Sequence, residues 1–146
     1  MSPSLGVLYV AEPPNHYLVL PPLVVDCSTL AGLLFQEDSQ NVAAQRIFGK
    51  ALHAPYLLQV ELTSVAAKKH KLGRTDIAQD GLAQFRNLHI DLHQIEPEAT
   101  LALAVRYKLA AYDAAYLWLA AELKAPLATF DEQLGRAAQV HLATLT

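Results

Sequence analysis

The pattern of apolar and polar residues changes at Pro22. Two short apolar stretches precede it, residues 5–10 and 17–20, and the prolines around them restrict such stretches to edge strands or loops. Leu23–Val25, which follows, is an apolar run rich in β-branched residues that ends at an aspartate, and this pattern predicts a buried parallel strand. We therefore expect an N-terminal extension over residues 1–22 and a single domain over residues 23–146.

Beyond the first strand, the spacing of apolar residues switches between the helical period and the alternation of a strand. Capping residues and turn signals delimit helices at about residues 28–35, 39–49, 56–72, 75–87, 97–109, 113–124 and 131–138. Strands are predicted at residues 89–95, 126–130 and 140–142. Pro55 is expected near the first turn of the helix over 56–72, with Gly73 just past its end. This alternation predicts an α/β fold with a central parallel sheet.

Composition narrows the class of protein. The chain has 146 residues, of which 53% are hydrophobic and 17% charged, so it is long enough for one full core and too apolar to be disordered. Cys27 is the only cysteine and no Lys or Arg precedes Arg46, so we expect a cytoplasmic protein without internal disulfides or a secretory signal. No apolar run approaches the ~20 residues of a transmembrane helix. The net charge of −3, taken alone, argues against a nucleic-acid partner.

Four acidic residues are candidates for chemistry. Asp26 ends the first strand, where ligands bind in open α/β sheets, although an ordinary turn aspartate would look the same. Glu61 has leucine or valine at its i−4, i−3 and i+4 positions, so it lies on an apolar stripe where a carboxylate is costly unless it is paired or binds a metal. Asp113 and Asp131 each precede a predicted helix, and helix capping explains either of them alone.

Taken together, the four carboxylates predict a metal centre. Two of them end parallel strands and two lie on helices beside the sheet, so all four can meet at one edge. Clustered carboxylates repel one another unless a cation neutralises them, and hard oxygen ligands favour Mg²⁺ or Mn²⁺. Two such ions about 3.5–4 Å apart form the common machinery for cleaving phosphodiester bonds.

Four segments give the chain a resemblance to a known family. They are Val24–Ser28, Val60–Val65, Leu109–Leu117 and Leu127–Leu134, and each contains one of the four acids. The third is the most specific, because its Tyr-Asp-Ala-x-Tyr sequence is typical of the VapC-type toxins of bacterial and archaeal toxin–antitoxin pairs. On these segments the chain resembles a PIN domain over nearly all of its length except the N-terminal extension, which is a departure from the family. The resemblance implies a three-layer α/β/α fold with a central, mainly parallel sheet.

The resemblance also implies an activity and a set of site residues. A PIN-domain toxin of this type is a metal-dependent endoribonuclease that uses Mg²⁺ or Mn²⁺, forms homodimers and is inhibited by a cognate antitoxin protein. Two alternatives remain, a PIN nuclease of RNA processing and a PIN scaffold that binds RNA or a partner without cleavage. By resemblance, the acidic site consists of Asp26, Glu61, Asp113 and Asp131, with the hydroxyls of Ser28 and Thr129 orienting the carboxylates or water.

A basic cluster lies at the end of the helix that carries Glu61. It comprises Lys68, Lys69, Lys71 and Arg74. These side chains can contact RNA phosphates, but the helix dipole alone also favours cations at a helix C-terminus, which is the simpler interpretation. His89 and His93 are poor joint metal ligands, because four residues of strand separate them by about 13 Å. With four of the 14 acidic residues assigned to one site that binds cations, the negative net charge no longer excludes RNA.

Overall fold

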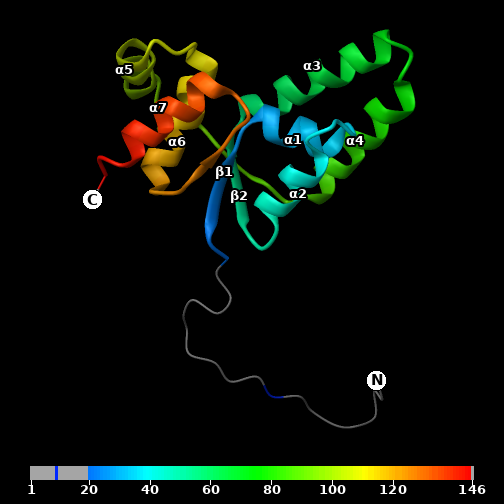
Figure 1. The fold of residues 1–146 in the computed structure, drawn as a ribbon, viewed down its shortest axis with the longest axis horizontal. Helices are drawn as coiled ribbons and strands as arrows, with labels where there is room; N and C mark the ends of the chain where they lie inside the picture. The colour runs from blue at the N-terminus through cyan, green and yellow to red at the C-terminus, as the bar shows by residue number, and fades with distance from the viewer. Residues whose placement is uncertain (1–8, 10–19, 146) are drawn as a thin grey trace.

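The structure is a computed structural model that describes residue 9 and residues 20–145. The possible strands at residues 5–10 and 17–20 lie outside the described residues, apart from one residue of each. The elements along the chain are β1 (Pro22–Val25), α1 (Cys27–Leu34), α2 (Gln40–Ile47), β2 (Ala51–Pro55), α3 (Leu57–Lys71), α4 (Thr75–Asn87), β3 (Asp91–His93), α5 (Pro97–Tyr107), α6 (Ala111–Leu123), β4 (Leu127–Ala128) and α7 (Glu132–Leu142) (Figure 1).

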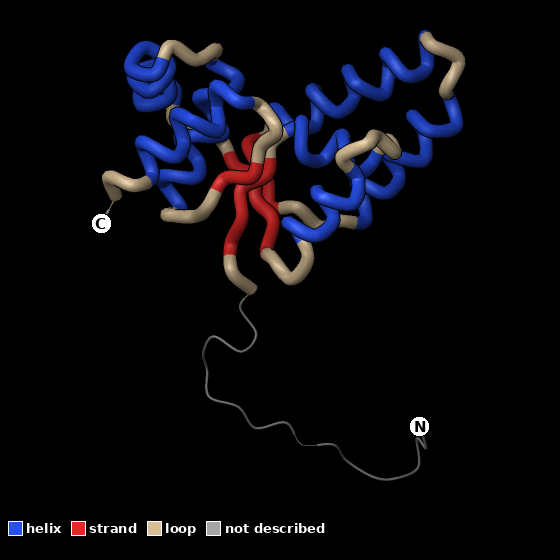
Figure 2. Tube along the Cα trace, in the orientation of Figure 1, coloured by secondary structure: helices blue, strands red, loops and turns tan. Residues whose placement is uncertain are grey.

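The four strands form one parallel sheet in the order β3-β2-β1-β4. β1 is a central strand, in which Val24 pairs with His53 of β2 on one side and with Leu127 of β4 on the other. Helices α1–α4 lie on one side of the sheet and α5–α7 on the other, so the fold has three layers (Figure 1 and Figure 2). This arrangement confirms the predicted α/β/α fold, and it brings the carboxyl ends of β1 and β4 together.

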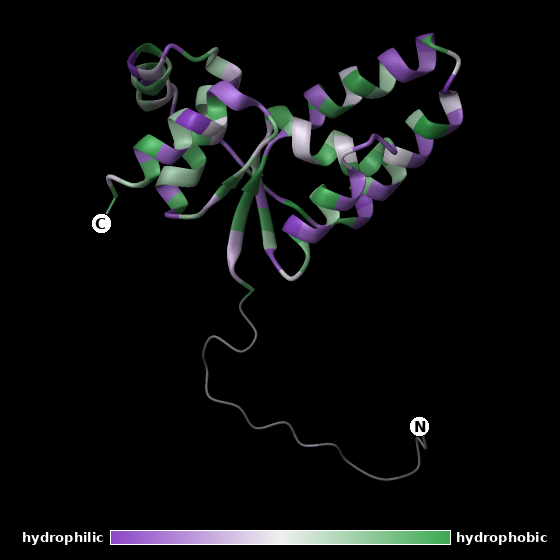
Figure 3. Cartoon of the chain, in the orientation of Figure 1, coloured by the Kyte–Doolittle hydropathy of each residue, from purple (hydrophilic) through white to green (hydrophobic). Residues whose placement is uncertain are grey.

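The core forms where β1 meets α6. Leu23–Val25 are buried, and α6 is apolar on almost all sides, with Ala114–Leu117 buried in one run. A helix that is apolar all round is buried from several sides, and α6 contacts β1, β2 and β4. Figure 3 shows largely hydrophobic strands between helices that carry both hydrophobic and hydrophilic residues. Among the described residues, no helix has the length and apolar character needed to cross a membrane.

Two parts of the chain differ from the sequence prediction. Residues 51–55 form β2, and Pro55 is the last residue of that strand instead of part of the first turn of α3. The strand predicted at residues 140–142 is wrong, because apolar residues at helical spacing continue from Leu134 and α7 runs on to Leu142. In the described part of the chain, no strand therefore pairs with the outer edge of β4.

Two glycines inside helices test how closely the layers pack. A Cβ at Gly81 of α4 would overlap the ring of Phe35 and lie 2.9 Å from the Leu34 carbonyl oxygen. A Cβ at Gly135 of α7 would meet only Thr129 Cγ2, at 3.6 Å. We expect Gly81→Ala to lower the free energy of unfolding by about 1–3 kcal/mol through overpacking. Gly135→Ala should leave it unchanged or raise it by up to about 1 kcal/mol, because alanine favours a helix. Urea unfolding measures both, and equal effects would contradict the close packing of α4 on α1.

Candidate active site

Asp26 is the residue around which the site is built. It follows β1 directly, is 4% exposed and caps α1, where its Oδ1 accepts a hydrogen bond of 3.0 Å from the backbone N–H of Thr29. The hydroxyl of Ser28 donates to the same Oδ1 at 2.7 Å, and that of Thr129 donates to Oδ2 at 2.5 Å. The Thr29 hydroxyl lies 3.1 Å from Oδ1 and 2.9 Å from the Ala128 carbonyl oxygen, so it donates to one of them at a time. These donors satisfy a buried carboxylate that would otherwise be costly.

Ser28 and Thr129 connect Asp26 to the loop that follows β4. Each hydroxyl has one proton and donates it to Asp26, so its oxygen is free to accept from the backbone. Ser28 Oγ accepts from the N–H of Phe130, and Thr129 Oγ1 accepts from the N–H of Asp131, both at 2.9 Å. The backbone of Asp131 is thus tied to the Asp26 carboxylate through side-chain hydroxyls.

Glu61 lies on α3 and is half-buried against α6. Its Oε1 accepts a hydrogen bond of 2.6 Å from the hydroxyl of Tyr116. Burial raises the pKa of Glu61, the Tyr116 hydrogen bond lowers it, and the charges of Asp26 and Asp113 raise it further. Burial and the bond to Glu61 also raise the pKa of Tyr116 far above its usual range, so its hydroxyl stays protonated and remains a donor. Tyr116 is therefore the group that favours the ionised form of Glu61.

Asp113 and Asp131 lie at the first turns of α6 and α7. The cap of α6 is Ala110, so the capping role considered for Asp113 is wrong. Asp131 does cap α7, and its Oδ1 accepts from the N–H of Leu134 at 2.8 Å. Asp113 accepts no hydrogen bond from any described residue. Burial raises the pKa of Asp113, and the charges of Asp131 and Asp26 raise it further.

The four carboxylates share one electrostatic environment. Asp26 and Asp113 raise the pKa of Glu61, while Asp131 and Asp26 raise that of Asp113. Such effects need proximity, so Asp26 and Asp113 lie near Glu61, and Asp131 lies near Asp113. Within the described residues, however, no three His, Cys, Asp or Glu side chains are arranged as a ready-made metal site. Asp26, Glu61 and Asp131 accept hydrogen bonds from neighbouring donors instead, such as Tyr116 for Glu61.

The basic cluster divides into two parts. Lys69 Nζ lies 3.3 Å from a carboxylate oxygen of Glu37, so it joins α3 to the loop after α1. Lys68 is exposed, and its positive charge lowers the pKa of Cys27 in the first turn of α1. Burial, followed by the nearby carboxylates, raises the pKa of the Cys27 thiol to about 12, and Lys68 opposes that shift. Both remaining members are exposed, Lys71 in the last turn of α3 and Arg74 before α4.

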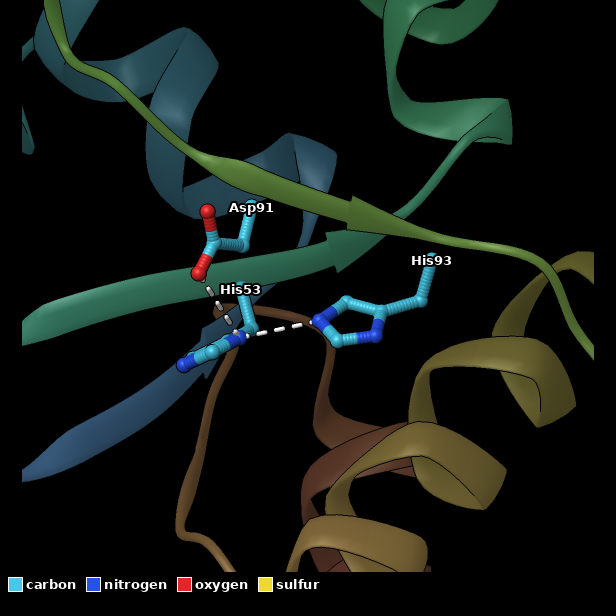
Figure 4. A network of polar contacts seen from close by, with 3 residues as sticks. All are labelled: His53, Asp91 and His93. Atoms are coloured by element: carbon cyan, nitrogen blue, oxygen red, sulfur yellow. Dashed lines mark hydrogen bonds and ion pairs between the residues drawn. The ribbon is translucent and has the colours of Figure 1, made fainter.

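A histidine pair joins β2 to β3 at the other edge of the sheet (Figure 4). Nδ1 of His53 lies 2.9 Å from Nε2 of His93 and 3.9 Å from a carboxylate oxygen of Asp91. Burial lowers the pKa of His53, as does His93, while Asp91 opposes the shift. β2 and β3 lie on the side of β1 away from β4, so this pair stabilises a sheet edge and stands outside the acidic cluster. His93 therefore pairs with His53 and not with His89.

Sequence reasoning does not identify Tyr116 or Thr29 as members of the site. Tyr116 is a core residue by its spacing, yet a buried tyrosine hydroxyl needs a partner, and Tyr116 stands three residues after Asp113 on the same helix. Thr29 lies at the predicted start of the helix over residues 28–35, where capping by its hydroxyl would be expected, but the cap is Asp26, and the Thr29 hydroxyl lies beside the Asp26 carboxylate. In both cases the available signal is a buried hydroxyl without an obvious acceptor.

The fold and the site together define a class of protein, an α/β/α domain with a cluster of carboxylates where the central parallel strands end. The family model described as "PIN domain" matches residues 23–140. The chain therefore belongs to the PIN domain family, as its resemblance predicted.

Curated relatives and a solved structure agree with this assignment. "VapC ribonuclease Mb0985" of Mycobacterium bovis and "Ribonuclease VapC9" of Mycobacterium tuberculosis are each 34% identical over 121 residues, covering 80% of this chain and 91% of theirs. "Ribonuclease VapC3" of Pyrobaculum aerophilum is 30% identical over 119 residues, covering 77% of this chain and 91% of its own. The crystal structure of PAE2754 from Pyrobaculum aerophilum matches with a TM-score of 0.63 at 24% identity, covering 84% of this chain and 96% of that one, and supports the fold.

Tyr116→Phe tests the contact between Tyr116 and Glu61. The change keeps the ring but removes the hydroxyl that lowers the pKa of Glu61, so we expect that pKa to rise. Tyr112→Phe is a matched control, because Tyr112 lies on the same helix but is 66% exposed, and it should leave the Glu61 pKa unchanged. A ¹³C NMR titration of the Glu61 carboxyl measures the effect. An unchanged or lower pKa in Tyr116→Phe would show that the hydrogen bond is absent in solution.

Proposed function

We propose that this chain is a metal-dependent endoribonuclease, the toxin of a type II toxin–antitoxin module. The observation that carries the proposal is Asp113, a half-buried carboxylate that accepts no hydrogen bond from any described residue. Asp131 and Asp26 add negative charge around it. A carboxylate in these surroundings is stabilised by a cation, and a cation bound there attracts the phosphates of a nucleic acid.

The names of the relatives support the substrate and the partner. Those of Mycobacterium and Pyrobaculum are named as VapC ribonucleases. We therefore propose RNA as the substrate and a cognate antitoxin protein as the inhibitor. We also propose that the protein forms a homodimer and is located in the cytoplasm. Residues 1–22 would be an N-terminal extension of the PIN domain.

The donor set fits Mg²⁺ or Mn²⁺. The four acids offer only carboxylate oxygens, which are the ligands that these hard cations prefer. Divalent ions bound there would activate water and stabilise charge on the phosphate and on the leaving 3′ oxygen. The residues that would hold them are Asp26, Glu61, Asp113 and Asp131.

The chain's own residues would prepare this site for a cation and for RNA. Ser28 and Thr129 hold the two oxygens of Asp26 in one orientation, which limits its rotation when other charges approach. Tyr116 donates to Glu61 and so favours the ionised carboxylate, the form that binds a cation. Lys68 adds a positive charge on the same helix as Glu61, where it can contact an RNA phosphate.

Asp113→Asn tests the site by activity and by metal binding. The change removes one carboxylate at nearly constant size, so RNA cleavage should fall at least about 100-fold and growth inhibition should be lost. Without metal, the variant should be at least as stable as the parent, because one repelling charge is gone. At neutral pH, Mg²⁺ should raise the Tm of the parent more than that of the variant. Asp80→Asn, an exposed acid of α4, is the control and should behave like the parent.

Other outcomes of the same experiment separate the alternatives. EDTA should stop cleavage, and Mg²⁺ or Mn²⁺ should restore it; cleavage that persists in EDTA would exclude the metal mechanism. Full activity of Asp113→Asn would remove Asp113 from the site. Cleavage without growth inhibition would indicate a nuclease of RNA processing, and RNA binding without cleavage would indicate a PIN scaffold.

Lys68→Ala and Lys69→Ala separate RNA binding from folding. Removal of the exposed Lys68 should weaken RNA binding for all sequences and reduce the salt slope by about 1, with an unchanged Tm. Removal of Lys69 breaks its ion pair with Glu37, so it should cost up to about 1 kcal/mol of stability and change the salt slope less. Fluorescence anisotropy over a salt series, in an Asp113→Asn background that prevents cleavage, measures the slopes. Equal slopes for the two variants would contradict this division.

A further inference from the structure

The sheet is open at β4. The carbonyl oxygens of Pro126 and Ala128 face β1, where they accept hydrogen bonds from Val24 (2.9 Å) and Asp26 (3.4 Å). Successive residues of a strand direct their backbone groups to opposite edges, so the N–H and C=O of Leu127 point away from β1. Among the described strands, none pairs with that outer edge. Such an edge is a template for one more strand.

A groove runs along the open edge. Its volume is about 540 Å³, and its floor is the stretch from Pro126 to Phe130. One wall comes from α2, including Val42 and Arg46, and the other from α7, including Leu142. The groove therefore lies between the two helical layers, in the position that the next strand of the sheet would occupy.

We propose that residues 5–10 of this same chain bind in this groove as an edge strand antiparallel to β4. The segment reads Leu-Gly-Val-Leu-Tyr-Val, without charge or proline, and prolines flank it at positions 3, 13 and 14. Valine and tyrosine are strand formers, whereas the flanking prolines cannot donate to a ladder. Tyr9, the one residue of this segment that the structure describes, is 84% exposed, so its side chain is available to pack against the apolar walls.

The connection is long enough for this arrangement. β1 and β4 are parallel and adjacent, so a strand added at the outer edge of β4 would lie two strand spacings, about 10 Å, from β1. Residues 11–19 span up to ~30 Å when extended. An antiparallel segment would end beside the start of β1, so that the link crosses only the end of β4. Because residues 5–10 are tethered close to the groove, their effective concentration there is higher than that of a segment from a separate partner.

The binding would act on the acidic site through β4. Thr129 follows the strand directly and donates to Asp26, while its oxygen accepts from the N–H of Asp131. A segment paired with Leu127 would hold this end of the strand and so stabilise the hydroxyl that orients Asp26. The binding of residues 5–10 depends only on the sheet edge and the groove, so it is expected whether or not the protein cleaves RNA.

Amide hydrogen exchange of the full chain, read by mass spectrometry over residues 126–130, tests the proposal. Leu8→Pro should break the added strand and speed exchange of the Leu127 amide about tenfold. His16→Pro, in the link, should not. From the groove side, Val42→Lys should also speed exchange, whereas Val140→Lys, equally 59% exposed but outside the groove, should not.

Each outcome has a defined meaning. Binding within one chain is supported if the Leu127 amide of the parent exchanges slowly at every protein concentration. In that case only Leu8→Pro and Val42→Lys should lose this protection. Protection that appears only as the concentration rises would overturn the proposal in favour of a second copy's segment. Identical exchange in the parent and in Leu8→Pro would show that residues 5–10 do not bind at β4. Circular dichroism and Tm of each variant verify that the domain is folded.

Discussion

The hydrogen bonds to Asp26 hold together the part of the molecule on which the site depends. A carboxylate that is 4% exposed is stable only with several donors, and it receives them from the start of α1 and from the residue after β4. Hydrogen bonds to a charged group contribute about 1.5–3 kcal/mol each. One side chain therefore caps a helix, joins two neighbouring strand ends and fixes the loop that leads to Asp131.

Glu61 and Asp113 oppose this stability. The pKa values of Glu61 and Asp113 are both raised in the folded protein, so the folded state binds their protons more tightly than the unfolded state. The usual pKa values of these carboxyl groups are 4.5 and 3.8. As the pH rises from these values through the raised pKa values of the folded protein, both groups ionise and the free energy of unfolding falls. The buried packing of β1 against α6 compensates for this cost. A cation that binds the ionised cluster would reverse it, so stability at neutral pH and metal binding are linked.

The sequence was sufficient for the fold class and the order of most elements, whereas the metal-binding role of the four acids stays a prediction. The spacing of the apolar residues and the acidic residues at the strand ends can both be recognised within short stretches of sequence. β2 was missed because Pro55 is equally typical of a first helical turn and of a strand end, and only the pairing of His53 with Val24 decides. Residues 140–142 were assigned to a strand because a run of only three residues, Val-His-Leu, cannot distinguish a strand from a continuing helix. Tyr116 was missed because its partner, Glu61, is distant in sequence.

Net charge is a property of the whole chain, whereas substrate binding depends on where charges lie. The −3 of this protein includes four acids whose carboxylates influence one another near the ends of β1 and β4. Lys69 forms an ion pair with Glu37, whereas the positive charge of Lys68 lowers the pKa of Cys27, the residue next to Asp26. A polyanion would thus be attracted by bound divalent ions and a small number of lysines, and not by a broad basic surface. Affinity for RNA should accordingly follow the divalent ion more steeply than the overall charge.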